Sequence, residues 1–387
     1  MQKVLIVHNH YRIPGGEDVV AENEAKLLSD HGHKVIRYIR DNASVKGKLS
    51  MLFGMFFSVR TYLDIRRIIR REKIDIVHVH NTLFLISPAV YYAAVAEHVP
   101  VVQTMHNFRL LCPAATFYRN KHVCEDCIKQ GYGCALKGKC YRNSLLQTAA
   151  VMLMNFLHLH SGIYKKVNFI CLTEFNRQKL LLLNRKKRLV DPGKIRIKPN
   201  FTQAAKTVRM AGNENPYYLV LGRIEALKGS SLIAKAFSKN GRRLIFAGDG
   251  DQKAALEHFI ERKGIDNIEC RGQLTHEEAM ELLSGAKALI VAPQWYETFG
   301  MTVIEAYSLG IPVIAADFGN PGSLVRDGIT GLLFNNTVKG LNDAIELFET
   351  MDREKMSDNA FWEYERRYSP EINYKELINI YDSLKSR

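Results

Sequence analysis

The sequence predicts an α/β protein of two doubly wound domains, each built on a parallel sheet with helices on both faces. Three observations lead to this fold class. Short apolar runs rich in β-branched residues alternate with helical stretches, as in parallel sheets that are covered on both sides. A polar stretch near residue 200 interrupts this alternation, which then restarts. The 387 residues are also too many for one compact hydrophobic core.

The first domain is predicted over residues 1–200. Helices separate its strands, and the clearest of these helices are expected over about 17–29 and 87–97. The expected strands are KVLIVHNH (3–10), HKVIRYI (33–39), IDIVHVH (74–80), VPVVQTM (99–105), NFICLT (168–173) and IRIKPN (195–200).

The second domain is predicted over residues 201–367, and it begins with a polar linker, FTQAAKTVRMAGNENP (201–216). Its expected strands are YYLVLG (217–222), RLIFAG (243–248), NIECRG (267–272), ALIVAP (288–293) and IPVIAA (311–316). Two such domains joined by a linker place a crevice between them. Ligands of doubly wound sheets lie beyond the carboxyl ends of the strands, so the loops that follow the strands are the candidates for function.

The composition is that of an ordinary folded protein, with 47 % hydrophobic and 24 % charged residues. No segment approaches the roughly 20 apolar residues that span a bilayer. The apolar N-terminal run breaks after Val7 and lacks the longer apolar core and the cleavage site of a signal peptide. We therefore expect a cytoplasmic protein.

The formal charge of +14 is concentrated in the first half of the chain. Residues 1–200 hold 32 Lys and Arg against 14 Asp and Glu, whereas the remaining residues hold 22 against 26. A basic half-molecule indicates a polyanionic partner, either nucleic acid or an anionic membrane surface. The alternative is that the charge serves only solubility.

Two acids, Glu297 and Glu305, lie in the stretch YETFGMTVIEAYSLGIPVIA (296–315). If a helix ran throughout, the 1.5 Å rise per residue would separate them by roughly 12 Å. That is about the span from a sugar ring, past a diphosphate, to a ribose. Glu305 either faces solvent or, together with Glu297, holds a polyhydroxylated ligand.

A helix is expected from about Phe299 to Ser308 within this stretch. The backbone N–H groups of Gly300, Met301 and Thr302 then lie at its positive end, which favours an anion. One turn of chain would thus offer carboxylates to hydroxyl groups and N–H donors to phosphate.

The loop LGRIEALKGSS (221–231) presents Arg223 and Lys228 after the strand that ends at Gly222. Arg and Lys at a strand end suit a diphosphate, Arg as a fork and Lys as a point charge. Basic residues are common in loops, and the indication comes from the expected position of this loop opposite Glu297.

Two glycine-containing loops follow the next strands. The glycines of AGDGD (247–251) either admit a ligand close to the backbone or form a tight turn. In CRGQLTHEE (270–278), Gly272 to Leu274 are expected to present backbone groups to a base edge. Thr275 and Glu278 have the spacing of a helix-capping box.

Two loops of the first half join the candidates. In HNHYRIPGGEDVV (8–20), Gly15 and Gly16 open a helix whose N–H groups can face a phosphate. The spacing is not GxGxxG, which argues against a dinucleotide fingerprint. His106, in QTMHNFRLLCP (103–113), lies at a strand end, where either a structural or a functional role is open.

The spacing Glu297-x7-Glu305, together with FGMTVIEAYSLGIPVIA (299–315), resembles the signature of the family 4 retaining glycosyltransferases, which have the GT-B fold of two Rossmann-like domains facing a central cleft. The motifs LGRIEALKG, GDG and GGED and the histidine of VVQTMH are similar to other motifs of that family, in the same order. The resemblance covers essentially the whole chain and is strongest over residues 217–335.

The resemblance implies transfer of a sugar from a nucleotide-diphosphate sugar, with retention of the anomeric configuration and without a metal. A front-face displacement is implied, since no side-chain nucleophile is identified. Glu297 would contact the donor sugar, and Glu305 the ribose. The final helix (about 368–387) would cross back onto the first domain. The donor-binding residues implied are Gly16, Gly222, Arg223, Lys228, Gly272, Leu274, Glu297, Phe299, Gly300, Met301 and Glu305, and the catalytic ones are His106, Glu297, Arg223 and Lys228.

Five of the seven cysteines fall between residues 112 and 140, which indicates a metal site in a cytosolic protein. The loop has little apolar content, and a structural zinc ion on four thiolates would hold it. The predicted ligands are Cys124, Cys127, Cys134 and Cys140. The later spacings are not those of a standard zinc ribbon, and free thiols or a disulfide are the alternatives.

Residues 46–73 combine apolar Met, Leu and Phe with clustered Arg, a pattern typical of a basic amphipathic helix on an anionic membrane. The alternative is a core helix with a solvated basic face. The run NRKKRL (184–189) adds positive charge. These features predict a peripheral protein on the inner face of the membrane.

Together these observations predict a glycosyltransferase that uses a UDP- or GDP-sugar and a saccharide or lipid-diphosphate-linked acceptor, as in bacterial cell-surface polysaccharide or glycolipid assembly. One competing hypothesis is a nucleotide-sugar epimerase of the same fold. Another is a basic nucleic-acid-binding protein without enzyme activity. The aromatic and basic motifs of known nucleic-acid-binding modules are absent, so we expect no nucleic-acid partner.

Overall fold

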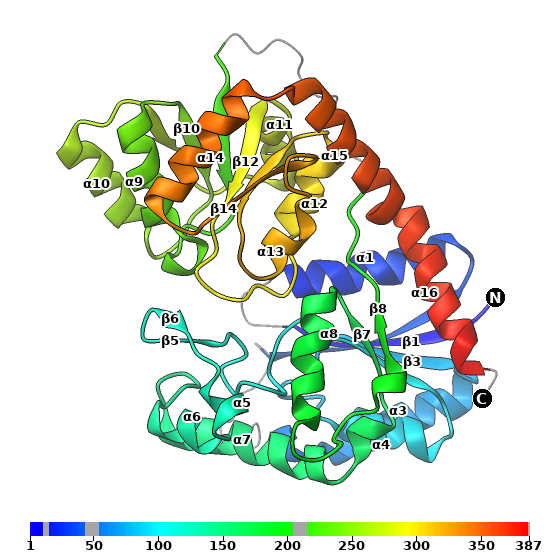
Figure 1. Ribbon diagram of the computed structural model, residues 1–387. Coiled ribbons are helices and arrows are strands. Elements are labelled where there is room, and N and C mark those ends of the chain that lie inside the picture. Colours follow the sequence, from blue (N-terminus) through cyan, green and yellow to red (C-terminus); the bar gives the residue numbers. More distant parts are fainter. Residues whose placement is uncertain (11–14, 43–53, 204–214, 386–387) are drawn as a thin grey trace. The chain divides into compact units, whose positions relative to one another are not determined.

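The computed structural model describes residues 1–10, 15–42, 54–203 and 215–385 (Figure 1). The chain forms two compact units. Unit 1 contains Met1–Arg119, Cys124–Asn200 and Asn373–Arg387, and unit 2 contains Asn120–Val123 and Phe201–Ile372. Most of the predicted linker lies outside the described residues.

Unit 1 has a six-stranded parallel sheet in the order β2-β1-β3-β4-β7-β8. Its strands are β1 (Lys3–His10), β2 (Lys34–Asp41), β3 (Ile76–Val79), β4 (Val101–Thr104), β7 (Asn168–Cys171) and β8 (Ile195–Ile197). Its helices are α1 (Gly16–Asp30), α3 (Val59–Glu72), α4 (Ala89–Ala96), α5 (Asp126–Lys129), α6 (Gly133–Lys137), α7 (Leu145–His160), α8 (Glu174–Leu181) and most of α16 (Pro370–Lys385), with short 3-10 turns at Ile163–Lys165, Leu182–Asn184 and Pro192–Lys194.

Unit 2 repeats this design with the parallel order β11-β10-β9-β12-β13-β14. Its strands are β9 (Tyr217–Leu221), β10 (Leu244–Ala247), β11 (Ile268–Cys270), β12 (Ala286–Val291), β13 (Val313–Ala316) and β14 (Gly331–Phe334). Its helices are α9 (Ser230–Asn240), α10 (Lys253–Lys263), α11 (His276–Ser284), α12 (Met301–Ser308), α13 (Gly319–Leu324), α14 (Val338–Thr350) and α15 (Arg353–Arg367), with a 3-10 turn, η5, at Ala226–Lys228. Two short strands, β5 (Tyr118–Arg119) and β6 (His122–Val123), form a separate two-stranded sheet.

These two sheets confirm the predicted fold class and all eleven predicted strands. Strand β14 was not predicted. The helix before it, α13, has only six residues, GNPGSL, and this sequence shows no helical periodicity. The predicted capping box of α11 is confirmed: the Glu278 N–H donates to Thr275 Oγ1 at 3.3 Å, and the Thr275 N–H donates to Glu278 Oε2 at 2.7 Å.

The single helix predicted over residues 46–73 is wrong in extent. Residues 43–53 lie outside the described residues, and α3 begins only at Val59, where the Ser58 hydroxyl accepts the Thr61 N–H. The helix buries Ile65 and Ile69. Its arginines pair with acids of the same unit, since Arg66 and Arg70 both contact Glu97, the latter at 2.7 Å. This pattern favours the alternative of a core helix with a basic solvated face.

The core of unit 1 lies between its sheet and two helices that come from opposite ends of the chain. Ala25 and Leu28 of α1 pack with Leu377 and Tyr381 of α16 against the inward residues of β1, β3, β4 and β7. The apolar face of the carboxyl-terminal helix therefore forms part of the core of unit 1.

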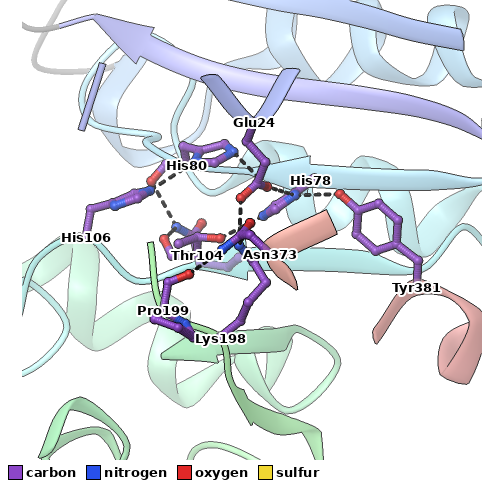
Figure 2. A network of polar contacts seen from close by, with 10 residues as sticks. Glu24, His78, His80, Thr104, His106, Lys198, Pro199, Asn373 and Tyr381 are labelled. Carbon is purple, nitrogen blue, oxygen red and sulfur yellow. Dashed lines mark hydrogen bonds and ion pairs between the residues drawn. The ribbon is translucent and has the colours of Figure 1, made fainter. Parts of the chain in front are cut away.

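A fully buried ion pair lies beside this core (Figure 2). Glu24 of α1 and Lys198, just after β8, each keep 1 % of their side chains exposed, and their atoms Oε2 and Nζ are 3.1 Å apart. Lys198 Nζ also donates to Asn373 Oδ1 at 2.8 Å, and Asn373 Nδ2 donates to the Pro199 carbonyl at 2.7 Å. The pair thus ties α1, the end of β8 and α16 together.

Lys198→Met is expected to destabilise the protein by about 3–5 kcal/mol, because it leaves the Glu24 carboxylate buried without its cation. The free energy of unfolding from urea titration measures this. The double variant Glu24→Gln, Lys198→Met should recover part of the loss, since no unpaired charge remains. Lys34→Met, which removes an exposed pair with Glu72, is the control and should leave the transition almost unchanged. A Lys198→Met loss below about 1 kcal/mol would contradict the assigned role.

Candidate active site

The carboxyl edge of the unit 2 sheet gathers most of the predicted residues. Strands β9 to β12 are parallel neighbours, so the loops that follow them meet at one edge. Gly222 and Arg223 follow β9, Gly272 and Leu274 follow β11, and Glu297 follows β12. These loops of unit 2 therefore lie together at one edge of the sheet, as predicted.

Glu297 and Lys228 form the closest charged contact at this edge. Lys228 Nζ donates to Glu297 Oε1 at 2.6 Å, with the lysine side chain 33 % exposed and the glutamate 12 %. Lys228 ends the 3-10 turn η5 and precedes Gly229, whose φ is +75°. A Cβ on Gly229 would lie 2.1 Å from the Ala292 carbonyl, so only glycine lets these two loops approach so closely.

Asn320 of α13 fixes the Glu297 loop from the other side. Its Nδ2 donates to the main-chain carbonyl of Glu297 at 2.6 Å. The ring of Tyr296 stacks on Phe318, with centroids 5.2 Å apart. The acid is therefore held by the backbone as well as by its contact with Lys228. Nothing in the spacing of the sequence indicated the contribution of Asn320.

Helix α12 begins at Met301, two residues later than predicted, and Gly300 at its N-cap has φ of +152°, a conformation that favours glycine. Phe299 is 4 % exposed and packs against the ring of Tyr368, with centroids 6.3 Å apart. Only the main chain of Phe299 can meet a ligand here. The first turn of α12 lies immediately after Glu297 and is the positive end of the helix.

Glu305 lies one helical turn further along α12. Burial raises the pKa of its carboxyl, an effect that His276 partly offsets. In the described part of the chain its carboxylate makes no hydrogen bond. An acid that is poorly solvated and lacks a hydrogen-bonding partner is a group that hydroxyl donors of a ligand would stabilise.

Arg223 extends into solvent, with 66 % of its side chain exposed and Nη1 2.7 Å from Glu225 Oε1. The loops around it are tightly packed, because the Gly248 N–H donates to the Gly272 carbonyl at 2.7 Å and a Cβ on Gly248 would lie 1.9 Å from the Gly222 carbonyl. These glycines thus permit loop packing, while the arginine remains able to reorient toward a ligand.

In unit 1, His106 lies just beyond the end of β4 and belongs to a row of histidines (Figure 2). Its Nε2 is 2.9 Å from His80 Nδ1, and the two rings stack with centroids 5.2 Å apart. His78 stacks on the other side of His80, at 4.6 Å. Of these three histidines, only His106 was predicted from the sequence. The spacing of the two histidines in HVH (78–80) was the pattern that could have indicated the other two.

Glu24 lies at the inner end of this row. His78 Nδ1 is 2.9 Å from Glu24 Oε1 and 2.7 Å from the Tyr381 hydroxyl, and His80 Nε2 is 3.7 Å from the same carboxylate oxygen. The carboxylate favours a proton on His80 Nε2. The contact between His80 Nδ1 and His106 Nε2 leaves Nδ1 as the ring nitrogen of His106 that His80 does not occupy.

Both rings are neutral in the folded protein. Burial lowers the pKa of His106 to about 3 and the pKa of His80 well below its usual value. His106 borders a cavity of about 70 Å³ that Arg109 and Asn155 also line. Ligand pockets for drug-sized molecules are several times larger, so this cavity can take only a small polar part of a ligand.

Gly16 is the first residue of α1, close to a second polar cluster that the sequence did not predict. Asp18 Oδ1 is 2.7 Å from His8 Nε2 and 2.9 Å from His10 Nδ1, while Asp18 Oδ2 accepts the Gly15 N–H at 2.8 Å. The Gly15 N–H is therefore already bound within the protein. The predicted anion site at this helix end therefore depends on the backbone N–H of Gly16.

Within the described ranges, only two groups of three or more side chains place candidate metal-ligand atoms within 4.8 Å of one another. They are His8, His10 and Asp18, and Glu24, His78 and His80. The second group already holds the ammonium of Lys198, whose charge opposes a metal cation. The first group is hydrogen-bonded through Asp18, and in the second both histidines lie against Glu24 Oε1. We interpret the two groups as polar networks that orient the loops at the carboxyl ends of β1 and β3.

Comparison with known proteins agrees with this geometry. Residues 203–362 match the family of glycosyl transferases group 1, and residues 14–124 match glycosyltransferase family 4. The matches reach both halves of the chain, and the chain belongs to the glycosyltransferase family that they describe.

Individual relatives match more distantly. The alpha-D-kanosaminyltransferase of Streptomyces kanamyceticus is 30 % identical over 178 residues, which are 44 % of this chain and 46 % of that protein. The chain thus spans less than half the length of this curated relative. A glycosyltransferase structure from Rickettsia africae has a TM-score of 0.69 at 19 % identity, covering 99 % of this chain and 98 % of that one. Anabaena Alr3699/HepE in complex with UDP-glucose has a TM-score of 0.67 at 15 % identity, covering 100 % of both chains. These structures establish the GT-B fold.

Acid should destabilise unit 1 through its neutral histidines. Between pH 6.5 and about 3, the unfolded chain binds a proton at His106 that the folded chain does not, so the free energy of unfolding falls as the pH falls. One such group contributes up to about 1.4 kcal/mol per pH unit. His106→Asn should make the decline between pH 6.5 and 5.5 shallower in urea titrations, a range in which unfolded Glu24, with its ordinary pKa of 4.5, takes up few protons. An unchanged decline would mean that folded His106 is protonated.

Proposed function

We propose that the protein is a retaining glycosyltransferase that moves a sugar from a nucleotide-diphosphate sugar to a saccharide or lipid-linked saccharide acceptor. The observation that carries the proposal is the arrangement around α12. The Lys228–Glu297 pair at 2.6 Å lies before the positive end of this helix, and the hydrogen-bond-deficient Glu305 lies one turn further on. An acid, a cationic position and a second acid follow one another here. In such a donor the sugar hydroxyls, the phosphates and the ribose hydroxyls follow one another in the same order.

The chemistry of each residue follows from its surroundings. Glu297 is fixed by Lys228 and by Asn320, so it can accept hydrogen bonds from sugar hydroxyls without a large loss of side-chain entropy. Glu305 gains hydrogen bonds from ribose hydroxyls. Lys228 already stands 2.6 Å from a carboxylate and can share its charge with a phosphate, because an ammonium has three donors.

Arg223 and the first turn of α12 would stabilise the leaving diphosphate. Charge on that group grows as the glycosidic bond breaks, and preorganised donors and dipoles lower the energy of the state in which it is greatest. Within the described residues Arg223 pairs only with Glu225, and the arginine side chain itself is largely exposed, so turning toward the diphosphate costs little. The proposed reaction needs no residue that forms a covalent bond to the sugar.

His106 is assigned to the transferred sugar. Its neutral ring would hydrogen-bond a sugar hydroxyl through Nδ1, and the cavity beside it suits a single small polar group. Its contact with His80 fixes the plane of the ring. His80 and Glu24 would act as positioning residues, since they reach the ligand only through His106.

A calorimetric titration with UDP and GDP tests the donor site. UDP is the first probe, because the related HepE structure contains UDP-glucose. Arg223→Ala should weaken binding of the nucleotide diphosphate by about 1.5–3 kcal/mol, the cost of a charge-assisted contact. Arg243→Ala is the matched control: Arg243 immediately precedes β10, so it lies at the amino edge of the same sheet. Equal affinities for the wild type and Arg223→Ala would refute this assignment.

Transfer itself is tested with Glu297→Gln, which keeps the size of the side chain and removes its charge. We expect loss of sugar transfer with an unchanged circular dichroism spectrum. Nearly normal turnover would disprove the role. Consumption of the donor without a glycosylated product would instead support an epimerase, and salt-sensitive binding of nucleic acid without nucleotide-sugar binding would support the nucleic-acid hypothesis.

The acceptor side of the proposal includes an anionic membrane, and the exposed side chains of α7 support it. None of the described helices is both long and apolar enough to cross a bilayer. Helix α7 exposes a row of large apolar side chains: Leu146 is 81 % exposed, and Leu145, Leu153, Phe156 and Leu157 lie between 48 and 51 %. Leu146, Leu153 and Leu157 are spaced by seven and four residues, so they share one face of the helix.

Basic residues adjoin this apolar row. Phe156 and His160 line the same groove as Arg185, Lys186 and Lys187, and these three cations are exposed and make no ion pair within the described chain. Apolar side chains beside unpaired cations complement a bilayer with anionic headgroups, where each basic residue near the surface contributes roughly 1 kcal/mol. We infer peripheral binding through this face of α7.

Co-sedimentation with vesicles tests the membrane surface. The protein should bind vesicles of anionic phospholipid more strongly than neutral ones, and the double variant Leu146→Ser, Leu153→Ser should lower the affinity at least about tenfold, because two leucines leave the acyl region. Leu347→Ser, at a leucine of α14 that is 53 % exposed, is the control. Equal binding by the α7 and α14 variants would rule out this surface.

A further inference from the structure

The segment between β4 and α7 carries more positive charge than its acids neutralise. Residues 107–143 contain seven Lys and Arg but only two acids, Glu125 and Asp126. Both acids already have cationic partners, because Lys129 Nζ is 3.7 Å from Glu125 Oε2 and Arg119 Nη2 is 2.5 Å from Asp126 Oδ2. Other cations of this segment are therefore left to attract a charge from outside the protein.

The zinc site that the sequence predicts in this segment stays a prediction. All seven cysteines of the chain are free thiols. In the described structure no three of the predicted ligands, Cys124, Cys127, Cys134 and Cys140, place their sulfur atoms within 4.8 Å of one another. The thiols thus define no ligand geometry, whereas two arginines of the same segment lie together.

These two arginines, Arg109 and Arg142, contact the same aromatic ring. Their guanidinium carbons are 5.6 and 5.5 Å from the centroid of the Tyr141 ring. Neither arginine makes an ion pair with a residue that the structure describes. Two like charges in one neighbourhood repel each other, so an anion that contacts both would lower their energy.

Arg109 lies at the cavity that His106 borders. Its main chain is fixed on both sides, since its carbonyl accepts from Asn155 Nδ2 at 2.6 Å and its N–H donates to Asn107 Oδ1 at 3.1 Å. The hydrogen bond of its side chain, from Nη1 to the Pro113 carbonyl, is long at 3.4 Å. A guanidinium has five N–H donors, so most of those of Arg109 remain available to a ligand.

Asn155 of α7 adds a hydrogen-bond acceptor to the same cavity. The residue is 1 % exposed, and its Oδ1 has no hydrogen-bond partner within the described ranges. Leaving a buried oxygen unpaired is unfavourable, and a hydroxyl group of a ligand in the cavity would satisfy it. The surroundings of the cavity thus suit a ligand that carries both an anionic group and hydroxyl groups.

We propose that Arg109 and Arg142 bind a diphosphate group of the acceptor, so that the acceptor is a diphosphate ester of a saccharide and not a neutral sugar. A guanidinium fork matches the oxygen atoms of a phosphate, and it does so bidentately. Two such forks suit the two negative charges of a diphosphate ester better than the single charge of a sugar carboxylate. The inference rests on the proposed function, because it names the class of acceptor for that reaction.

Calorimetric titration of the full-length protein with inorganic pyrophosphate tests the site. The titration uses the Arg223→Ala background, in which binding by the donor loops of unit 2 is weakened. Arg109→Met and Arg142→Met should each lower the affinity at least about tenfold, through the loss of a charge-assisted contact. Lys137→Met, which removes an exposed cation of the same segment, is the control and should change the affinity less than about twofold.

Several results would overturn the proposal. They are no binding of pyrophosphate, an unchanged affinity in both arginine variants, and an equal loss in Lys137→Met, which would mean that only the general positive charge attracts the anion. Tighter binding of glucuronate than of pyrophosphate would assign the arginines to a sugar carboxylate instead. If Arg109→Met fails to fold, Arg142→Met still decides, because that side chain is exposed. Titration of the wild type with UDP reports on the donor site separately, so failure of the proposed function and failure of this site give different results.

Discussion

A single buried carboxylate organises unit 1. Glu24 is almost entirely removed from water, and an isolated charge there would be too costly to keep. Lys198 pairs with it and His78 contacts it, while Asn373 of α16 holds the lysine. Satisfying one charge therefore fixes the positions of α1, β3, the end of β8 and the carboxyl-terminal helix. The same carboxylate lies 3.7 Å from His80, which contacts His106, so the stability of the unit and the geometry of its candidate site involve the same group.

Unit 2 depends on a different constraint, the parallel arrangement of its strands. Parallel strands place all their carboxyl ends at one edge, so loops that are far apart in the sequence meet there. Close packing of these loops requires glycine where backbones approach, as at Gly229 and Gly248. Lys228 and Glu297 are brought together by this packing, although 69 residues separate them. The pairing of these two side chains is thus a product of sheet topology.

The success of sequence-based prediction followed the strength of the local pattern. Buried strands such as KVLIVHNH read clearly, because every parallel strand is apolar on both faces. Strand β14 was missed, since the short glycine-rich helix before it gives no periodic signal. The extent of α3 was wrong because a run of apolar and basic residues does not reveal the Ser58 cap. The side chain of Phe299 packs on Tyr368, a partner that is remote in the sequence, so no local pattern indicated this contact.

The sequence by itself determined the two parallel sheets, the loops at their carboxyl edges and the family, because these follow from patterns within short stretches of chain. Only the tertiary structure decided which side chains meet. It brought His106 against His80 and His80 toward Glu24, and it exposed Leu146, Leu153 and Leu157 on α7, a helix that the sequence did not single out. The physical reason is that contacts between distant segments depend on packing in three dimensions, which local periodicity does not encode.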